Sequence, residues 1–313
     1  MARVVRDGAD DALHLGHVAV TDDAGDLVVA YGDPTVVIYP RSAVKPFQAA
    51  ASLQLIGRRI PADEVAVMAA SHVGSRRHQA AVLRVLDRAG LSPAALRCPP
   101  ALPVDDATLR DRPEPTRLAH NCSGKHAGFL LATVAAGADP AQHLAERAVV
   151  QQTVRTWLRA CCGGLRGPGV DGCGAPAWRM PLQALARGFA RLSAADGALG
   201  AVAAAMRGHP DLVGGAGTVD TELMHAEPAV IAKRGAEGVL AMAVGTRTQP
   251  LGVAIKISDG AARAVGPVAA ALIERLGLRG AAAVRSPAVF GGGAPHGAVE
   301  ISGDLDAVLA ALG

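Results

Sequence analysis

The segment RSAVKPFQ, residues 41–48, places a serine and a lysine three positions apart, and a proline follows directly. Residues three apart share one face of a helix, so Lys45 can reach the hydroxyl of Ser42 if the segment is helical. A helix tolerates proline only in its first turn, so Pro46 predicts a helix that starts here with Ser42 at its N-terminus. There a deprotonated lysine can activate a serine, and backbone N–H groups favour an oxyanion. The alternative is a helix-capping serine beside a solvated lysine.

Strand signals lie on both sides of this helix start. Residues 17–20 and 27–30 predict a hairpin with its turn at 22–26, and strands return at 229–233, 239–244 and 251–257. Helices are predicted at 42–57, 76–89, 125–137, 140–160, 181–190, 195–207, 266–277 and 304–312. The apolar run 65–70 is interpreted as leading into a strand end or turn at Ser71.

This order of elements predicts an α+β fold, with one antiparallel sheet built from both terminal regions and a helical region inserted between them. The chain is predicted to form a single domain over residues 1–313. Its sheet subregion is expected at about 1–40 and 226–313, and its helical subregion at about 41–225.

The composition excludes several classes of protein. Half of the residues are hydrophobic, 19% are charged and the net charge is +3, which is typical of a globular protein. No block of Lys and Arg marks a surface for nucleic acid or membrane, and the first residues lack a signal-peptide pattern. The sequence therefore predicts a soluble, cytoplasmic protein that binds neither nucleic acid nor membrane.

Lysine is scarce, and its scarcity is informative. Of the 31 basic residues only four are lysines, namely Lys45, Lys125, Lys233 and Lys256. A composition that favours arginine so strongly predicts that the remaining lysines are positions where arginine, which stays protonated, cannot serve; the alternative is that they remain by chance. The same reasoning applies to Asn121, the one asparagine of the chain.

Two glycine-containing stretches carry further candidate residues. NCSGKHAG, residues 121–128, opens a predicted helix, so Cys122 and Lys125 project from one face of it. VDGCGAP, residues 170–176, presents an aspartate and a second cysteine. The five cysteines are an odd set, which argues for thiols or metal ligands and against disulfides. Cys122 and Cys173 can therefore be metal ligands or simply buried thiols.

Two shorter motifs complete the set. Ser71 begins SHVG, where it can supply a second hydroxyl to a catalytic pocket or cap the helix that follows. Lys233 begins KRGAEG at the end of a predicted strand, a place where Ser-x-x-Lys enzymes hold a second cation; the alternative is a hairpin turn. The acidic residues of 218–224 can cap a helix or bind a substrate amine.

Together these segments resemble the L-asparaginase II family of the rhizobial, thermolabile type, in the family's order and from about residue 3 to 301. The resemblance implies a fold like that of serine β-lactamases and penicillin-binding proteins. It implies two serine–lysine pairs, Ser42 with Lys45 and Ser71 with Lys233. It also implies a zinc ion held by Cys122, Lys125 and Cys173, and a homodimer. The residues expected to contact substrate are Arg41, His72, Asn121, His126 and Asp171.

The predicted activity is hydrolysis of the side-chain amide of L-asparagine to L-aspartate and ammonia through an acyl-enzyme. Ser42 is expected to attack with Lys45 as its base, while Ser71 and Lys233 assist proton transfer; either serine can carry the acyl group. The alternatives are a related serine amidohydrolase acting on glutamine or a β-lactam, or a non-catalytic, zinc-bound protein that binds an amino acid.

Overall fold

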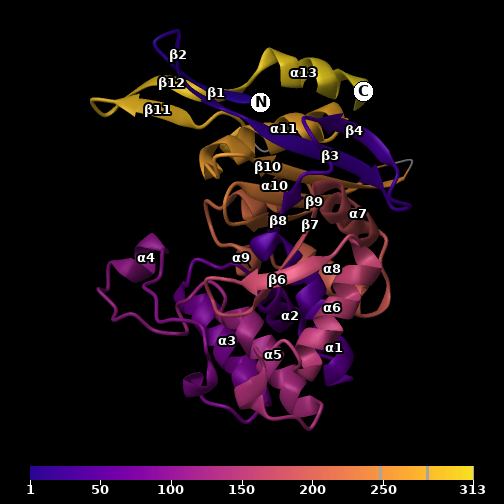
Figure 1. The fold of residues 1–313 in the computed structure, drawn as a ribbon. Helices are drawn as coiled ribbons and strands as arrows, with labels where there is room; N and C mark the ends of the chain where they lie inside the picture. Colours follow the sequence, from indigo (N-terminus) through magenta and orange to yellow (C-terminus); the bar gives the residue numbers. More distant parts are fainter. Residues whose placement is uncertain (247–248, 280–281, 313) are drawn as a thin grey trace. The chain divides into compact units, whose positions relative to one another are not determined.

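The computed structural model describes residues 1–246, 249–279 and 282–312, and the chain divides into two compact units (Figure 1). Unit 1 comprises Met1–Ala43, Met180–Ala194 and Glu222–Gly313, and unit 2 comprises Val44–Arg179 and Ala195–Thr221. Helices and antiparallel sheets occur together, which confirms the α+β class. The single-domain prediction stays a prediction.

Unit 1 is built on a five-stranded antiparallel sheet in the order β4-β3-β10-β9-β8. Its strands are β3 (Gly16–Asp22), β4 (Leu27–Tyr31), β8 (Val230–Gly235), β9 (Val239–Gly245) and β10 (Pro250–Ile257). All five were predicted from the sequence, and β3 of the N-terminal region pairs directly with β10 of the C-terminal region. The expected sheet built from both terminal regions is therefore present.

Helix α7 (Leu182–Ser193) packs on strands β3, β9 and β10 of this sheet. The approach requires a glycine in β10, because a Cβ at Gly252 would lie 1.8 Å from the carbonyl oxygen of Ala186. Helix α11 (Val265–Arg275) contacts β9 and β10 and also β12 of a second sheet. The two helices thus bury the apolar side chains of the central strands.

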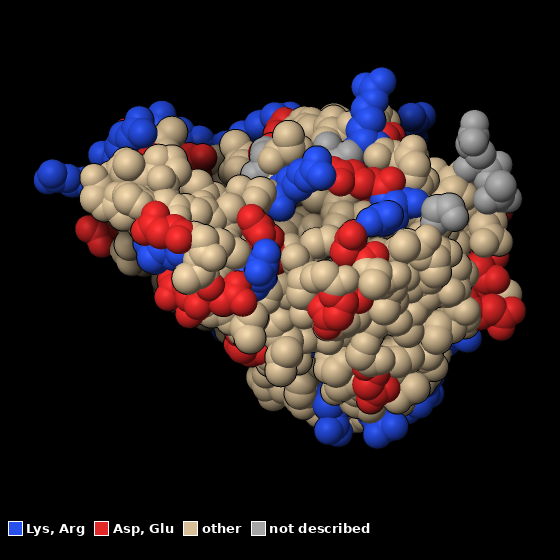
Figure 2. Space-filling model, turned by 90° about the horizontal axis from the view of Figure 1, so that it is seen from above, with Lys and Arg blue, Asp and Glu red and all other residues tan. Residues whose placement is uncertain are grey.

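The second sheet of unit 1 was not predicted. It has the order β11-β12-β1-β2, formed by β1 (Ala2–Arg6), β2 (Ala9–His14), β11 (Ala288–Gly291) and β12 (Ala294–Ile301). Its exposed strand β2 has the sequence ADDALH, with Leu13 as its one large apolar residue, so it lacks the alternation that marks a half-buried strand. Figure 2 shows basic and acidic side chains intermixed over one face of the molecule. In this sheet, Arg3 pairs with both Asp10 and Glu300 across β1, β2 and β12.

Smaller elements complete this part of the chain. They are β5 (Val37–Ile38), the 3-10 turn η1 (Arg41–Val44), α10 (Val219–Ala226), α12 (Ala282–Arg285) and α13 (Gly303–Leu309). None of the helices in the described ranges combines the length and apolar character needed to cross a lipid bilayer.

Unit 2 is mainly helical. Its helices are α1 (Lys45–Ile56), α2 (Ala62–Met68), α3 (Arg76–Arg88), α4 (Asp106–Leu109), α5 (Ser123–Ala135), α6 (Val149–Cys161), α8 (Gly197–Gly208) and α9 (Pro210–Val213). Helix α1 starts with Pro46 in its first turn, as predicted, and packs against α5, α6 and α8. A hairpin of β6 (Arg166–Val170) and β7 (Pro176–Pro181) completes the unit.

Two sequence interpretations of unit 2 were wrong. The run 65–70 lies largely in helix α2, because a short apolar run does not distinguish helix from strand. The acidic residues Asp63 and Glu64 in its first turn favour the helix. The helix predicted over 140–160 begins only at Val149, since residues 140–142 form a separate 3-10 turn capped by Asp139.

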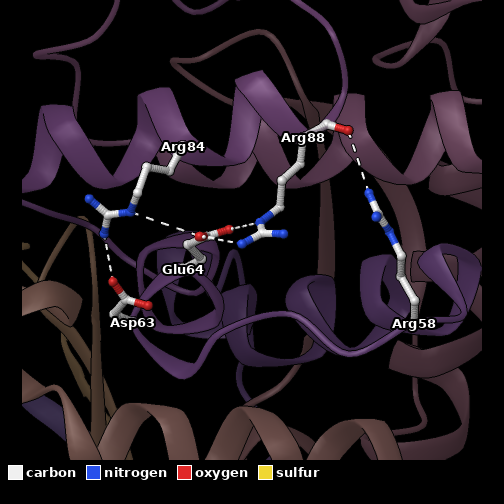
Figure 3. Close-up of polar contacts among 5 residues, drawn as sticks. All are labelled: Arg58, Asp63, Glu64, Arg84 and Arg88. Atoms are coloured by element: carbon white, nitrogen blue, oxygen red, sulfur yellow. Dashed lines mark hydrogen bonds and ion pairs between the residues drawn. The ribbon is translucent and has the colours of Figure 1, made fainter.

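A buried carboxylate ties α2 to α3 (Figure 3). Glu64 is only 2% exposed and accepts two hydrogen bonds from the guanidinium of Arg88, at 2.5 and 3.0 Å. Beside it, Arg84 donates to Asp63 at 2.6 Å. A bidentate pair with a buried carboxylate is among the stronger ionic contacts in proteins, because water screens it little.

We expect Glu64→Gln to lower the free energy of unfolding by about 1–3 kcal/mol, because the buried side of Arg88 loses its charged acceptor. Asp63→Asn is the matched control: its carboxylate is about one-third exposed, so the loss should stay within about 1 kcal/mol. Urea unfolding of the three proteins measures both values. Equal losses of unfolding free energy in the two variants would show that burial of Glu64 does not strengthen its contact with Arg88.

Candidate functional site

Lys45 is an almost completely buried ionisable group of the predicted site in unit 2, with an exposed fraction of 1%. Its Nζ donates to the carbonyl oxygens of Ala70, at 2.5 Å, and Asn121, at 3.3 Å. It also lies 2.9 Å from the Oγ of Ser71. Carbonyl oxygens can only accept, so they fix two of the N–H bonds, and the remaining position on nitrogen faces the Ser71 hydroxyl.

The environment shifts this amine toward its neutral form. Burial lowers the pKa of Lys45, and the neighbouring Lys125 lowers it further, while Cys122 acts in the opposite direction. When Lys45 is neutral, its two N–H groups still satisfy the carbonyls and its lone pair faces Ser71. The contact therefore suits transfer of a proton from serine to lysine.

This contact differs from the pairing expected from the sequence. Lys45 had been expected to act on Ser42, and Ser71 on Lys233. In unit 1, Ser42 lies in the 3-10 turn before α1, and the buried Lys233 on β8 donates to the carbonyl of Arg234 at 3.0 Å. The two expected pairs stay predictions, whereas the contact of Lys45 with Ser71 is observed.

Ser71 is held by its backbone and by the residue after it. Its N–H donates to the carbonyl of Val213, and the N–H of His72 donates to Asn121. The His72 ring uses both nitrogens within the protein: Nδ1 accepts from the N–H of Gly74, so Nε2 carries the proton toward the Oγ of Ser123 at 3.0 Å. His72, expected to contact substrate, thus connects the serine loop to the start of α5.

His78 supports His72 and was not singled out from the sequence. The two rings stack with centroids 4.8 Å apart. Nε2 of His78 donates to the carbonyl of Asp211, and Nδ1 contacts the hydroxyl of Ser75. Burial lowers the pKa of His78 to about 4, so the ring is neutral at pH 7. A histidine two residues into an amphipathic helix gives no sequence signal of this role.

Cys122, Lys125 and Cys173 come together as a buried cluster in unit 2. The Nζ of Lys125 donates to the Sγ of Cys173 at 2.9 Å, and that Sγ lies 3.7 Å from a carboxylate oxygen of Asp171. A tight turn positions Cys173: the N–H of Gly174 donates to the carbonyl of Asp171, with a φ of +84° at Gly174. The structure thus joins residues that lie about fifty positions apart in the sequence.

The three groups of this cluster shift one another's pKa values. The hydrogen bond with Cys173 lowers the pKa of Cys122 well below its ordinary value, and the same bond together with burial raises the pKa of Cys173. Burial opposes the charge on Lys125, yet the neighbouring Cys122 and Cys173 raise its pKa overall. These shifts favour charge on Cys122 and on Lys125 and oppose it on Cys173.

Glycines in the 121–128 stretch have a steric role. A Cβ at Gly124 would lie 2.1 Å from the carbonyl oxygen of Val67, and one at Gly128 would lie 2.9 Å from the side chain of Met68. Helix α5 therefore packs with its backbone against the end of α2. This packing brings Cys122 and Lys125 close to Ser71, which follows α2 in the chain.

His126 has an unusual buried nitrogen. Nδ1 of His143 donates to the carbonyl of Pro140, so Nε2 of His143 accepts, and Nδ1 of His126 donates to it at 3.5 Å. Nε2 of His126 is then a buried acceptor, and within the described residues it has no hydrogen-bond partner. Such a lone pair is available to a ligand or a water molecule.

A metal-binding role can be tested on these donors. In the described ranges, no group of three or more His, Cys, Asp or Glu side chains could hold a metal ion. The expected set is different, two sulfurs and one amine, and these lie together and buried. Thiolate and neutral amine are donors that zinc accepts, so the residues present fit the group.

The other expected substrate residues lie in varied settings. Asn121 has an exposed side chain, and its backbone carbonyl accepts hydrogen bonds from Lys45 and His72. Asp171 is half-buried beside Cys173. In unit 1, Arg41 is half-buried with a φ of +53°, a conformation that side chains other than glycine rarely adopt.

His78 makes stability depend on pH. Between pH 6.5 and about 4 the unfolded chain binds a proton at this position and the folded protein does not, so stability falls as the pH falls through this range. His78→Gln should reduce that loss, by up to about 3 kcal/mol at the acidic end. Urea unfolding over this pH range measures the slope, and exposed His225→Gln is the control. An unchanged slope for His78→Gln would contradict the assignment.

Comparison with known proteins agrees with the sequence resemblance. No curated protein matches the chain. The family model described as L-asparaginase II matches residues 2–300, which includes both glycine-containing stretches and every residue of the candidate site. The chain therefore belongs to the L-asparaginase II family.

Proposed function

We propose that this protein is an L-asparaginase, which hydrolyses the side-chain amide of L-asparagine to L-aspartate and ammonia. Membership of the family supports the reaction. The observation that carries the mechanism is the buried Lys45, whose Nζ lies 2.9 Å from the Ser71 hydroxyl with two carbonyls fixing its N–H bonds. A binding protein has no need of a buried amine aimed at a hydroxyl, because desolvating it is unfavourable.

The reaction proceeds by acyl transfer. A serine hydroxyl attacks the amide carbon as its proton passes to Lys45, and backbone N–H groups stabilise the oxyanion. The tetrahedral intermediate collapses, the proton returns to the leaving nitrogen, and ammonia departs. Water then hydrolyses the β-aspartyl ester, with Lys45 again acting as the base.

Ser42 is our proposed nucleophile, because it lies at a helix start three residues before Lys45. Ser71 relays the proton to Lys45, and Lys233 supports Ser71. The proposal includes a serine β-lactamase-like fold, a single domain, a homodimer and a cytoplasmic location, all of which rest on the family resemblance and the sequence.

Ser42→Ala and Lys45→Arg should each lower ammonia release from asparagine by several orders of magnitude, because one removes the nucleophile and the other keeps a charge that cannot act as a base. Ser71→Ala should retain an acyl-enzyme on Ser42, which mass spectrometry of the intact and digested protein detects. Detection of an ester on Ser71 in the wild type would show that Ser71 is the nucleophile and that Ser42 assists it. Activity in Lys45→Arg near that of the wild type would show that Lys45 is not the base.

We also propose that Cys122, Lys125 and Cys173 hold a zinc ion. Bound there, zinc would supply a positive charge that orients substrate and joins the 121–128 stretch to the 170–176 turn. The unpartnered Nε2 of His126 and the carboxylate of Asp171 are the nearby groups that can orient a ligand or a water molecule. Lys125 must lose its proton to bind, which explains why arginine does not replace it.

Metal analysis of the purified protein should find about one zinc per chain. Cys122→Ser and Cys173→Ser should each lose it, whereas Cys98→Ser, which alters a buried thiol outside the cluster, should keep it. Since the ligands release protons on binding, occupancy should decrease as the pH falls. Metal-free wild-type protein with unchanged thermal stability after zinc addition would show that these are ordinary thiols.

A further inference from the structure

Lys256 is the one lysine that the proposed reaction does not use. Arginine has replaced lysine almost everywhere in the chain, so its retention calls for a reason. It lies near the end of β10, opposite His17 on β3, and the two residues are direct partners in the sheet. Its Nζ donates to the backbone carbonyl of Glu237 at 2.5 Å. This bond uses one N–H and leaves two for other acceptors.

The lysine lines a pocket of about 470 Å³ that lies wholly within unit 1. The polar side chains that line it are those of His17, Tyr39, Arg41, Glu237, Lys256 and Ser258. Its apolar wall is formed by Val36, Val37 and Ile38. The volume suits a small organic molecule, with polar contacts on one side and an apolar surface on the other.

The lining is rich in donors. His17 accepts a hydrogen bond from the N–H of Asp33 on Nδ1, so in its neutral form Nε2 carries the proton. Arg41, Lys256 and the hydroxyls of Tyr39 and Ser258 add further N–H and O–H groups. The close approach of Gly32 keeps the His17 ring in place, because a Cβ there would lie 2.7 Å from Nδ1.

The lining carries charged groups of both signs. Arg41 and Lys256 are its basic residues, and Glu237 is its acidic residue. An oxygen of Glu237 lies toward Gly260, 2.8 Å from where a Cβ would stand. The nearby Asp259 pairs with His14 at 2.7 Å. Within the described ranges Lys256 forms no ion pair, so a small anion that enters the pocket can pair with its ammonium group.

Two strained residues lie in the same pocket. Among the described residues only four other than glycine have a positive φ, and Arg41 (+53°) and Glu237 (+60°) are two of them. Such conformations are unfavourable by about 1 kcal/mol or more and persist where the surrounding structure requires them, often at binding sites. Here the strain sets Arg41 into the pocket and turns the carbonyl of Glu237 toward Lys256.

We propose that this pocket is a binding site for a small carboxylate, held by Lys256 and Arg41 and by the Nε2–H of His17. The carboxylate most directly available, if the proposed function is right, is the product L-aspartate. The site itself needs only a carboxylate, and inorganic phosphate offers related chemistry from another source. Because Arg41 directly precedes Ser42, occupancy would fix the backbone next to the proposed nucleophile.

Burial makes a site-resolved experiment possible. Lys45, Lys125 and Lys233 are 1%, 2% and 0% exposed, while Lys256 is only partly buried. Burial also lowers the pKa of Lys256, which raises the reactivity of its amine. An amine-acetylating reagent should therefore label Lys256 and, more slowly or not at all, the other three. Peptide mass spectrometry reads each position separately.

The probes are succinate, L-aspartate and inorganic phosphate, each titrated against the labelling rate of Lys256 in the full-length protein. At ten times its dissociation constant a ligand should slow labelling about tenfold, because only the free protein reacts. The N-terminal amine is the internal control for the reagent. Arg41→Gln should weaken the protection by succinate, while Arg263→Gln, which alters a unit 1 arginine bonded to His14 outside the pocket, should not.

If succinate or L-aspartate slows the labelling of Lys256 and phosphate does not, the result supports a carboxylate site. Equal protection by phosphate contradicts selectivity for a carboxylate. Labelling of Lys256 that no probe slows would overturn the inference. Binding measured by calorimetry, lost in Lys256→Met and partly kept in Lys256→Arg, would support it independently. Ammonia release is measured separately: an inactive protein that still shows protection refutes the proposed function alone, and an active protein without protection refutes this inference alone.

Discussion

The burial of one charged group imposes the arrangement of the helical unit's centre. A lysine nitrogen removed from water must find partners for its N–H groups, or the unfolding equilibrium shifts by several kcal/mol. Lys45 finds them on two separate segments, the turn after α2 and the residue before α5. Both segments must therefore lie against the start of α1 for Lys45 to keep these contacts. The same bonds align Ser71, so the stability of the fold and the geometry of the proposed chemistry have one cause.

Further contacts reinforce this constraint from the neighbouring residues. His72 bonds to Ser123 at the start of α5, and Gly124 lets that helix lie directly on the end of α2. The cluster of Cys122, Lys125 and Cys173 is thereby held beside the Lys45 contact. The two buried amines and the two buried cysteines of this region shift one another's pKa values, which is typical of sites that perform acid–base chemistry.

The sequence predicted the five-stranded sheet and most helices because their apolar patterns are regular. Lys45 was identified from its spacing to Ser42 and from the rarity of lysine, but its contact with Ser71, 26 positions away, depends on how α2 packs. The second sheet was missed because β2 lacks the alternation of a half-buried strand, and the role of His78 was missed because its partners come from the distant residue Asp211 and from a ring stack. Local pattern thus identifies elements and candidate residues, whereas tertiary packing decides which candidates meet.

The pairing of the first strands with the last has a consequence for synthesis. Val20 of β3 has its partner, Val253 of β10, near the far end of the chain, and Val4 of β1 pairs with Val299 of β12. On the ribosome the N-terminal hairpin keeps an open apolar edge until β10 has emerged. Helix α8, which packs on α1 and α2, is also made late. Closing this sheet therefore requires very long loops, which slows folding, and the unpaired strand edge is prone to association until its partner is made.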